Sequence, residues 1–135
     1  MTSVASWAHR ALRGAACYHH CSDAPECCER YSQAVDEDVI GVYENPAGIS
    51  PQTIVITEKG IYISNRESMT CLEYGNLQTI RGPDAKTGDG VIQITEHDGR
   101  SSIIRVEGRD GKYRDVYSMV RFLDRVAAQK RGERA

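Results

Sequence analysis

Seven short runs with strand-like alternation, followed by one amphipathic helical stretch, fill the chain from Val39 to Lys130. Apolar residues recur at every second position in the runs and at every third or fourth position in the final stretch. This order, with the helix last, predicts an α+β protein that is mainly β. The runs are residues 39–43, 53–57, 61–63, 71–74, 77–80, 91–95 and 102–107.

Two pairs of runs predict β-hairpins. In residues 53–64, TIVITEKGIYIS, Gly60 can adopt the positive φ that a tight connection often needs. The runs at 91–95 and 102–107 flank Asp98 and Gly99, and an Asp-Gly pair is among the strongest hairpin signals. The final helix is predicted from Asp115, which can cap it. Its apolar stripe comprises Val116, Met119, Val120, Leu123, Val126 and Ala127.

The first 35 residues differ in composition from the rest, because they are rich in cysteine and histidine. We therefore expect a Cys/His-rich extension at 1–35, a folded body at 36–131 and a tail at 132–135. Residues 3–17 predict a short helix with Trp7 and Leu12 on its apolar side. Pro25 and the acidic residues 36–38 predict a loop that leads into the body.

Length and charge exclude several classes of protein. A chain of 135 residues is long enough to form one core without disulfides, and a net charge of −2 argues against a general nucleic-acid binder. The charge is uneven, because residues 36–98 sum to −7 and residues 99–135 sum to +5. This asymmetry can orient the domain towards a charged partner, or it can reflect two solvated faces.

The cysteines and the apolar runs predict the compartment. No run approaches the ~18 apolar residues of a membrane span, and the N-terminus lacks the apolar centre of a secretory signal. The five cysteines are an odd number, which makes a poor disulfide framework. We therefore expect a cytoplasmic protein in a reducing environment. Four of the cysteines lie within twelve residues: Cys17, Cys21, Cys27 and Cys28.

Residues 38–130 resemble the pleckstrin-homology-like (PH-like) superfold, which includes bacterial PH-like and GRAM-like domains. The resemblance rests on the strand count, on TIVITEKGIYIS (53–64), on CLEYGNLQTI (71–80) and on the closing helix DVYSMVRFLDRV (115–126). It implies a bent antiparallel sheet or partly open barrel of about seven strands, capped by one C-terminal helix. A small lipocalin-like barrel, or a sheet with a packed helix of another topology, would produce a similar pattern.

The resemblance implies a non-catalytic module, since the family is best known for binding phosphoinositide headgroups, proteins and peptides. Its lipid-binding members place basic residues around the first strand connection. Here that connection, ENPAGISPQ at 44–52, has none, so the lipid site is not carried over. We expect a protein-interaction adaptor or a small, immunity-type inhibitor. The alternative is a membrane-associated PH/GRAM-like adaptor that uses its N-terminal amphipathic segment.

Two groups of residues are candidates for partner binding. Arg114, Arg121 and Arg125 fall on one side of the final helix, away from its apolar stripe, and can form a patch for an acidic partner. A solvated helix face would show the same pattern. Trp7 and Leu12 can pack on the body or on a partner, or can lie on an anionic membrane. The resemblance also offers an open sheet edge and the groove beside the final helix.

The sequence offers few candidates for metal binding or catalysis. Its soft ligands lack the paired C-x2-C spacing that closes a zinc site readily, so we expect no metal and no other cofactor. His97 beside Asp98 is typical of a turn, Cys71 of an inert strand residue, and no nucleophile or phosphate-loop motif occurs. We therefore expect no enzyme. The weak metal-ligand candidates are Cys17, His20, Cys21, Cys27 and Cys28.

Overall fold

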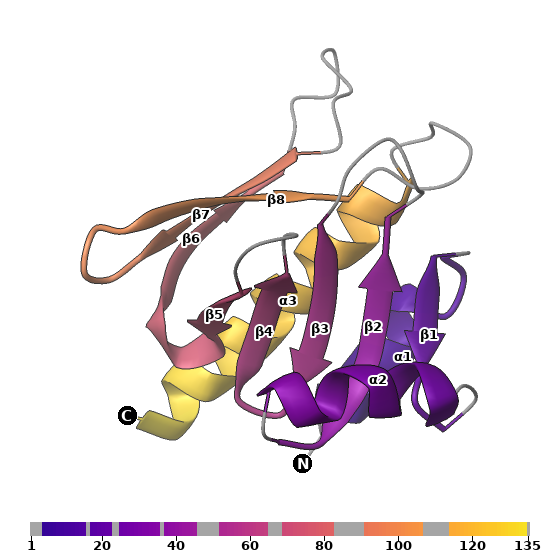
Figure 1. Cartoon of the computed structure of the whole chain (residues 1–135). Coiled ribbons are helices and arrows are strands. Elements are labelled where there is room, and N and C mark those ends of the chain that lie inside the picture. The colour runs from indigo at the N-terminus through magenta and orange to yellow at the C-terminus, as the bar shows by residue number, and fades with distance from the viewer. Residues whose placement is uncertain are drawn as a thin grey trace.

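The computed structural model describes residues 4–15, 17–22, 25–35, 37–45, 52–64, 69–82, 91–106 and 114–134. The chain is α+β, with strands in its centre and helices at both ends (Figure 1). The elements in order are α1 (Val4–Leu12), β1 (Tyr18–His20), α2 (Pro25–Val35), β2 (Val39–Glu44), β3 (Thr53–Thr57), β4 (Gly60–Ser64), β5 (Met69–Glu73), the 3-10 turn η1 (Tyr74–Asn76), β6 (Leu77–Arg81), β7 (Val91–Glu96), β8 (Ser101–Arg105) and α3 (Arg114–Arg134).

The strands form two antiparallel sheets. One has five strands in the order β1-β2-β3-β4-β5, and the other has three in the order β6-β7-β8. The chain passes from one sheet to the other at η1, and β6–β8 extend away from the larger sheet (Figure 1). The predicted antiparallel strands and C-terminal helix are confirmed. The two sheets are not closed into a barrel.

Both predicted hairpins are confirmed, for different local reasons. In the β7–β8 hairpin Gly99 has φ of 93°, a conformation that residues with a Cβ rarely adopt. The prediction for the β3–β4 hairpin was wrong in detail, because Gly60 does not have positive φ. Gly60 is required for room instead, since a Cβ there would collide with the backbone carbonyl oxygen of Leu72 on β5.

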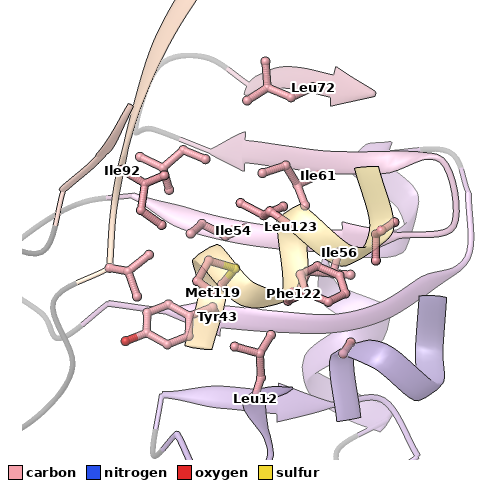
Figure 2. Packing of buried hydrophobic residues seen from close by; sticks show 14 of the residues in the cluster. Leu12, Tyr43, Ile54, Ile56, Ile61, Leu72, Ile92, Met119, Phe122 and Leu123 are labelled. Atoms are coloured by element: carbon pink, nitrogen blue, oxygen red, sulfur yellow. The ribbon is translucent and has the colours of Figure 1, made fainter. Parts of the chain in front are cut away.

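The main core lies between α3 and the inner face of the larger sheet (Figure 2). The apolar stripe of α3 packs against alternate residues of β3 and β4, and full burial of one such side chain contributes about 1.5–3 kcal/mol. Phe122, which the predicted stripe omitted, is 1% exposed and meets Tyr74 edge to face at 6.1 Å between ring centroids. The residues labelled in Figure 2 are Leu12, Tyr43, Ile54, Ile56, Ile61, Leu72, Ile92, Met119, Phe122 and Leu123.

The opposite face of the larger sheet is also covered. Val42 on β2 and Val55 on β3 are buried against Cys28 and Val35 of α2. Figure 1 shows α2 in front of this sheet and α3 behind it. Burial on both faces explains why β3 reads as an almost continuous apolar run.

The N-terminal residues contribute to the same fold. The short helix predicted at 3–17 exists as α1, although it ends at Leu12. Residues 18–20, which were not expected to pair, form β1 at the edge of the larger sheet. The loop predicted around Pro25 was wrong. Pro25 is the first residue of α2, a position where its fixed φ suits a helix and no N–H is needed.

Asp115 does not have the predicted capping position. Helix α3 begins one residue earlier, at Arg114, so Asp115 lies in the first turn. Its Oδ2 accepts a 2.7 Å hydrogen bond from the hydroxyl of Tyr43 on β2. The carboxylate therefore links the start of α3 to the sheet.

Candidate functional site

Helix α1 lies against α3 and buries one side of its amphipathic surface. Val4, Ala8 and Leu12, at helical spacings of four, are at most 1% exposed. Trp7 in the middle of α1 donates a hydrogen bond from Nε1 to Oε1 of Gln129 in the last third of α3, at 3.0 Å. This packing sets the side chains that flank the buried stripe of α1 beside those of α3.

A pocket of about 270 Å³ opens where these two helices meet. Its apolar surface comes from Trp7, the half-buried Ala11 and the buried Phe122. Its polar surface comes from three arginines, all of them exposed. The arginines are Arg10, Arg121 and Arg125.

The indole of Trp7 organises two of the guanidinium groups. The Cζ of Arg125 lies 5.0 Å from the centroid of the Trp7 ring, and the Cζ of Arg10 lies 5.9 Å from it. Both distances are within the range of a cation–π contact, which contributes about 0.5–1 kcal/mol at an exposed site. Two cations on one aromatic ring therefore share a small volume.

No carboxylate in the described part of the chain neutralises these cations. The ion pairs found there join His19 to Glu44, Arg100 to Asp98 and Lys130 to Glu58, and none involves a pocket arginine. The pocket is thus a site of concentrated positive charge with an apolar floor. Such a site can bind an oxyanion through paired N–H donors, but it contains no nucleophile or general base of its own.

The structure brings together three of the five residues proposed for partner binding. Trp7, Arg121 and Arg125 line one pocket although more than a hundred residues separate Trp7 from the arginines. Arg114 begins α3, and its side chain lies outside the described set. Leu12 is a correction: it is 0% exposed and belongs to the core, so it offers no surface to a partner or a membrane.

Three pocket residues were missed by the sequence analysis. Arg10, Ala11 and Phe122 were not among the residues proposed for partner binding. The sequence signal that could have indicated Arg10 and Phe122 was their helical spacing from residues already proposed for binding. Arg10 stands three residues after Trp7, and Phe122 lies between the two predicted arginines, so both fall near residues already proposed.

The cysteine cluster forms a covalent link instead of a metal site. Cys21, just after β1, is disulfide-bonded to Cys28 of α2, although the odd number of cysteines was expected to make a poor disulfide framework. Cys17 is buried and is not disulfide-bonded, and the side chain of Cys27 lies outside the described set. His20 Nδ1 is 2.7 Å from the hydroxyl of Tyr18. The described residues contain no group of three side chains that could hold a metal ion.

The other candidates from the sequence are apart from the pocket. Cys71 on β5 is exposed as a residue, but its surroundings remove part of the water from its thiol. This partial burial raises the pKa of the thiol and favours the unreactive protonated form. His97 is an exposed turn residue. The carboxylate of Asp98 accepts from the backbone N–H of Arg100 and pairs with its side chain, 3.4 Å from Nε.

The connection predicted to lack a lipid site, 44–52, falls mostly outside the described residues, but its two flanks are informative. Gln52 Oε1 accepts from the backbone N–H of Arg105 at 2.8 Å, and Asn45 Nδ2 donates to the Arg105 carbonyl, also at 2.8 Å. These side-chain amides take the place of a neighbouring strand at the end of β8. The edge of β8 is therefore not open there to a partner strand.

None of the helices, over their described residues, has the length and apolar character needed to cross a bilayer. Comparison of the chain with protein-family models, with curated proteins and with solved structures gave no match in any of the three.

Proposed function

We propose that the protein is a non-catalytic, PH-like binding module that docks an acidic protein partner on the face formed by α1 and α3. In this role it acts as an adaptor or as a small, immunity-type inhibitor that masks its partner. The partner contacts the positive pocket around Trp7, and the two sheets serve as the scaffold that holds α3 in place.

The order of the elements supports the PH-like part of this proposal. Seven antiparallel strands, β2–β8, are followed by one terminal helix, which is the number and order on which the resemblance rests. The N-terminal elements add β1 at one edge and α2 on one face of the larger sheet. These additions leave the outer side of α3 accessible at Arg121 and Arg125.

One observation carries the proposal: three arginines line one pocket, two of them over the ring of Trp7, without a carboxylate partner in the described part of the chain. Grouped like charges repel one another, and a solvated helix face has no need of the aromatic platform that holds them. An acidic partner would relieve the repulsion and gain paired hydrogen bonds.

The membrane-associated alternative has less support. It requires the apolar side of α1 to enter a bilayer, yet Val4, Ala8 and Leu12 of that side are buried against the rest of the core. Insertion of α1 would have to break this packing first.

Charge reversal tests the proposed face. Native partners are captured on the full-length protein and purified, and the dissociation constant of the complex is measured at several salt concentrations. We expect the double variant Arg121→Glu/Arg125→Glu to weaken the complex by about 100-fold or more and to flatten its salt dependence, because two interfacial attractions become repulsions.

The matched control is Arg100→Glu, which reverses an exposed arginine at the distant tip of the β7–β8 hairpin. This variant should bind like the parent protein. A complex that tolerates the double reversal as well as it tolerates Arg100→Glu would contradict the proposal.

A further inference from the structure

We propose that the pocket between α1 and α3 is an anchoring subsite for one acidic side chain of a partner polypeptide, together with the apolar side chain beside it. This inference rests on the proposed function and specifies what the partner must present. The occupant is a short Asp- or Glu-containing segment with an adjacent residue such as leucine. Its carboxylate meets the guanidinium groups, and its apolar neighbour lies on Ala11 and Phe122.

The volume of the pocket limits what it can hold. Sites for cofactors and drug-sized ligands usually measure about 300–1,000 Å³. At about 270 Å³ this pocket lies just below that range and has room for one or two side chains. A bare inorganic anion would leave the apolar floor uncovered, so the shape favours a ligand with both a charged and an apolar part.

The two kinds of surface lie next to each other inside the pocket. Phe122 is 1% exposed and forms part of the floor, whereas Arg121, its neighbour in α3, is exposed. On α1, Ala11 and Arg10 have the same relation. Each helix therefore supplies an apolar residue and a cationic residue at adjacent positions. A ligand that spans the two helices contacts an apolar and a cationic side chain on each of them.

The arrangement of charge favours a carboxylate. The Cζ atoms of Arg10 and Arg125 lie 5.9 Å and 5.0 Å from the centroid of the Trp7 ring, so the two guanidinium groups lie close to the same ring. The planar guanidinium fork matches a carboxylate with two parallel N–H···O hydrogen bonds. An acidic side chain placed among these forks offsets the mutual repulsion of the cations.

The pocket is partly preorganised before a ligand arrives. The hydrogen bond from Trp7 to Gln129 fixes the indole, and the indole holds the guanidinium groups of Arg10 and Arg125 over its ring. Ordering a free, rotamer-rich side chain on binding costs about 0.5–1.5 kcal/mol. Part of this ordering is already present, which helps a short segment to bind.

A polypeptide is a better occupant than an anionic membrane. A membrane meets a broad area of the protein, and residues 36–98 carry a charge of −7 that would repel it. A short peptide needs to contact only the pocket and not the rest of the surface. The apolar side of α1, which a membrane would need, is buried.

Trp7 allows a direct test because it is the chain's single tryptophan and lines the pocket. The probe is a blocked hexapeptide of alternating glutamate and leucine, and the control peptide has every glutamate replaced by glutamine. Binding to the full-length protein is followed by tryptophan fluorescence and by calorimetry. We expect a saturable response to the glutamate peptide alone, and a dissociation constant about tenfold weaker for Arg121→Gln.

Two controls define the site. Arg121→Gln is chosen because the structure records no contact between Arg121 and the Trp7 ring among the described residues, and circular dichroism verifies its fold. Arg100→Gln should bind the peptide like the parent. Equal binding of the two peptides, no binding of either, or binding of inorganic phosphate or phosphatidylserine vesicles in place of the peptide would overturn the inference.

The outcomes distinguish the subsite from the proposed function. If the glutamate peptide does not bind but Arg121→Glu/Arg125→Glu still disrupts the captured complex, the anchoring subsite is wrong and the docking face stands. If the peptide binds at the pocket but the captured complex tolerates the reversal, the subsite stands and the proposed docking face is wrong.

Discussion

Tyrosine hydroxyls supply polar contacts inside a core that is otherwise aliphatic and aromatic. Tyr43 donates to Asp115, and Tyr74 donates to the backbone carbonyl of Thr57 at 2.8 Å. Both side chains are 0% exposed. Burial raises the pKa of Tyr43 and of Tyr74 above the ordinary value near 10, and for Tyr43 the hydrogen bond to Asp115 raises the pKa further.

These pKa shifts predict a loss of stability in alkali. Below about pH 10 both phenols are protonated in the folded and unfolded chains, so their contribution is fully present. Above that pH the unfolded chain loses protons that the folded chain keeps, and the free energy of unfolding falls by about 1.4 kcal/mol per pH unit for each such tyrosine. Urea unfolding between pH 9 and pH 12 measures this slope.

Tyr43→Phe is the variant for this measurement. Removal of the hydroxyl lowers stability at neutral pH by about 1–2 kcal/mol, because the hydrogen bond to Asp115 is lost. It should also make the alkaline slope shallower, since one titrating group is gone. An unchanged slope would show that Tyr43 does not titrate differently in the two states.

Single residues also show how far the sequence could predict the candidate site. Arg121 and Arg125 were found because helical periodicity places them off the apolar stripe of one continuous element. Arg10 was missed because it joins them only through the packing of α1 on α3, which brings together positions at opposite ends of the chain. Periodicity predicts which side of a helix faces the core, but it does not predict which other helix lies alongside.

At the scale of elements, the disulfide fixes α2 to the end of β1. Cys21 follows β1 directly, and Cys28 lies in the first half of α2, where it packs over Val42 and Val55. An 11-residue helix is marginal without such support. The covalent link closes a short loop with a sequence separation of 7 residues and limits the freedom of the unfolded chain.

Loss of the disulfide should release α2 before the rest of the fold. The chain-entropy model gives a decrease of about 2–3 kcal/mol in the free energy of unfolding for Cys21→Ser/Cys28→Ser, measured in urea. Hydrogen exchange at amides of α2 should accelerate more than at β3 and β4. Cys71→Ser, at an exposed thiol on β5, is the control and should behave like the parent.

A variant that unfolds like the parent would mean that packing on Val42 and Val55 holds α2 without the bond. The helix itself could have been expected from Pro25 and Glu26, which suit a first turn. It was missed because its cysteines and polar residues weaken the apolar period. The disulfide was missed because sequence spacing gives no distance between β1 and α2.

At the scale of the whole molecule, the N-terminal elements are integral to the core. Val4, Ala8 and Leu12 of α1 belong to the same buried cluster as Phe122 and Leu123 of α3. Beta-strand periodicity predicted all of the strands from β2 to β8, but not β1 or the division into two sheets. Strands paired by short turns are encoded locally, whereas η1, where the chain changes sheet, packs against α3, which is distant in the sequence.

A shortened chain that begins at Asp36 should therefore fold poorly. It lacks α1, β1 and α2, which exposes apolar side chains of α3 and the outer face of β2 and β3. We expect strong binding of a hydrophobic dye and no cooperative thermal transition. A chain that begins at Val4 is the control and should unfold like the parent. Cooperative unfolding of both chains at the same temperature would contradict this expectation.

The two amide side chains at the end of β8 have a consequence for behaviour at high concentration. A bare strand edge invites the same edge of another copy to pair with it, which is how many β-proteins begin to aggregate. Asn45 and Gln52 satisfy the backbone groups of Arg105 from within the same molecule, so this stretch cannot template such growth. We expect that replacement of Asn45 and Gln52 with apolar residues would make the protein aggregate under conditions in which it is still folded.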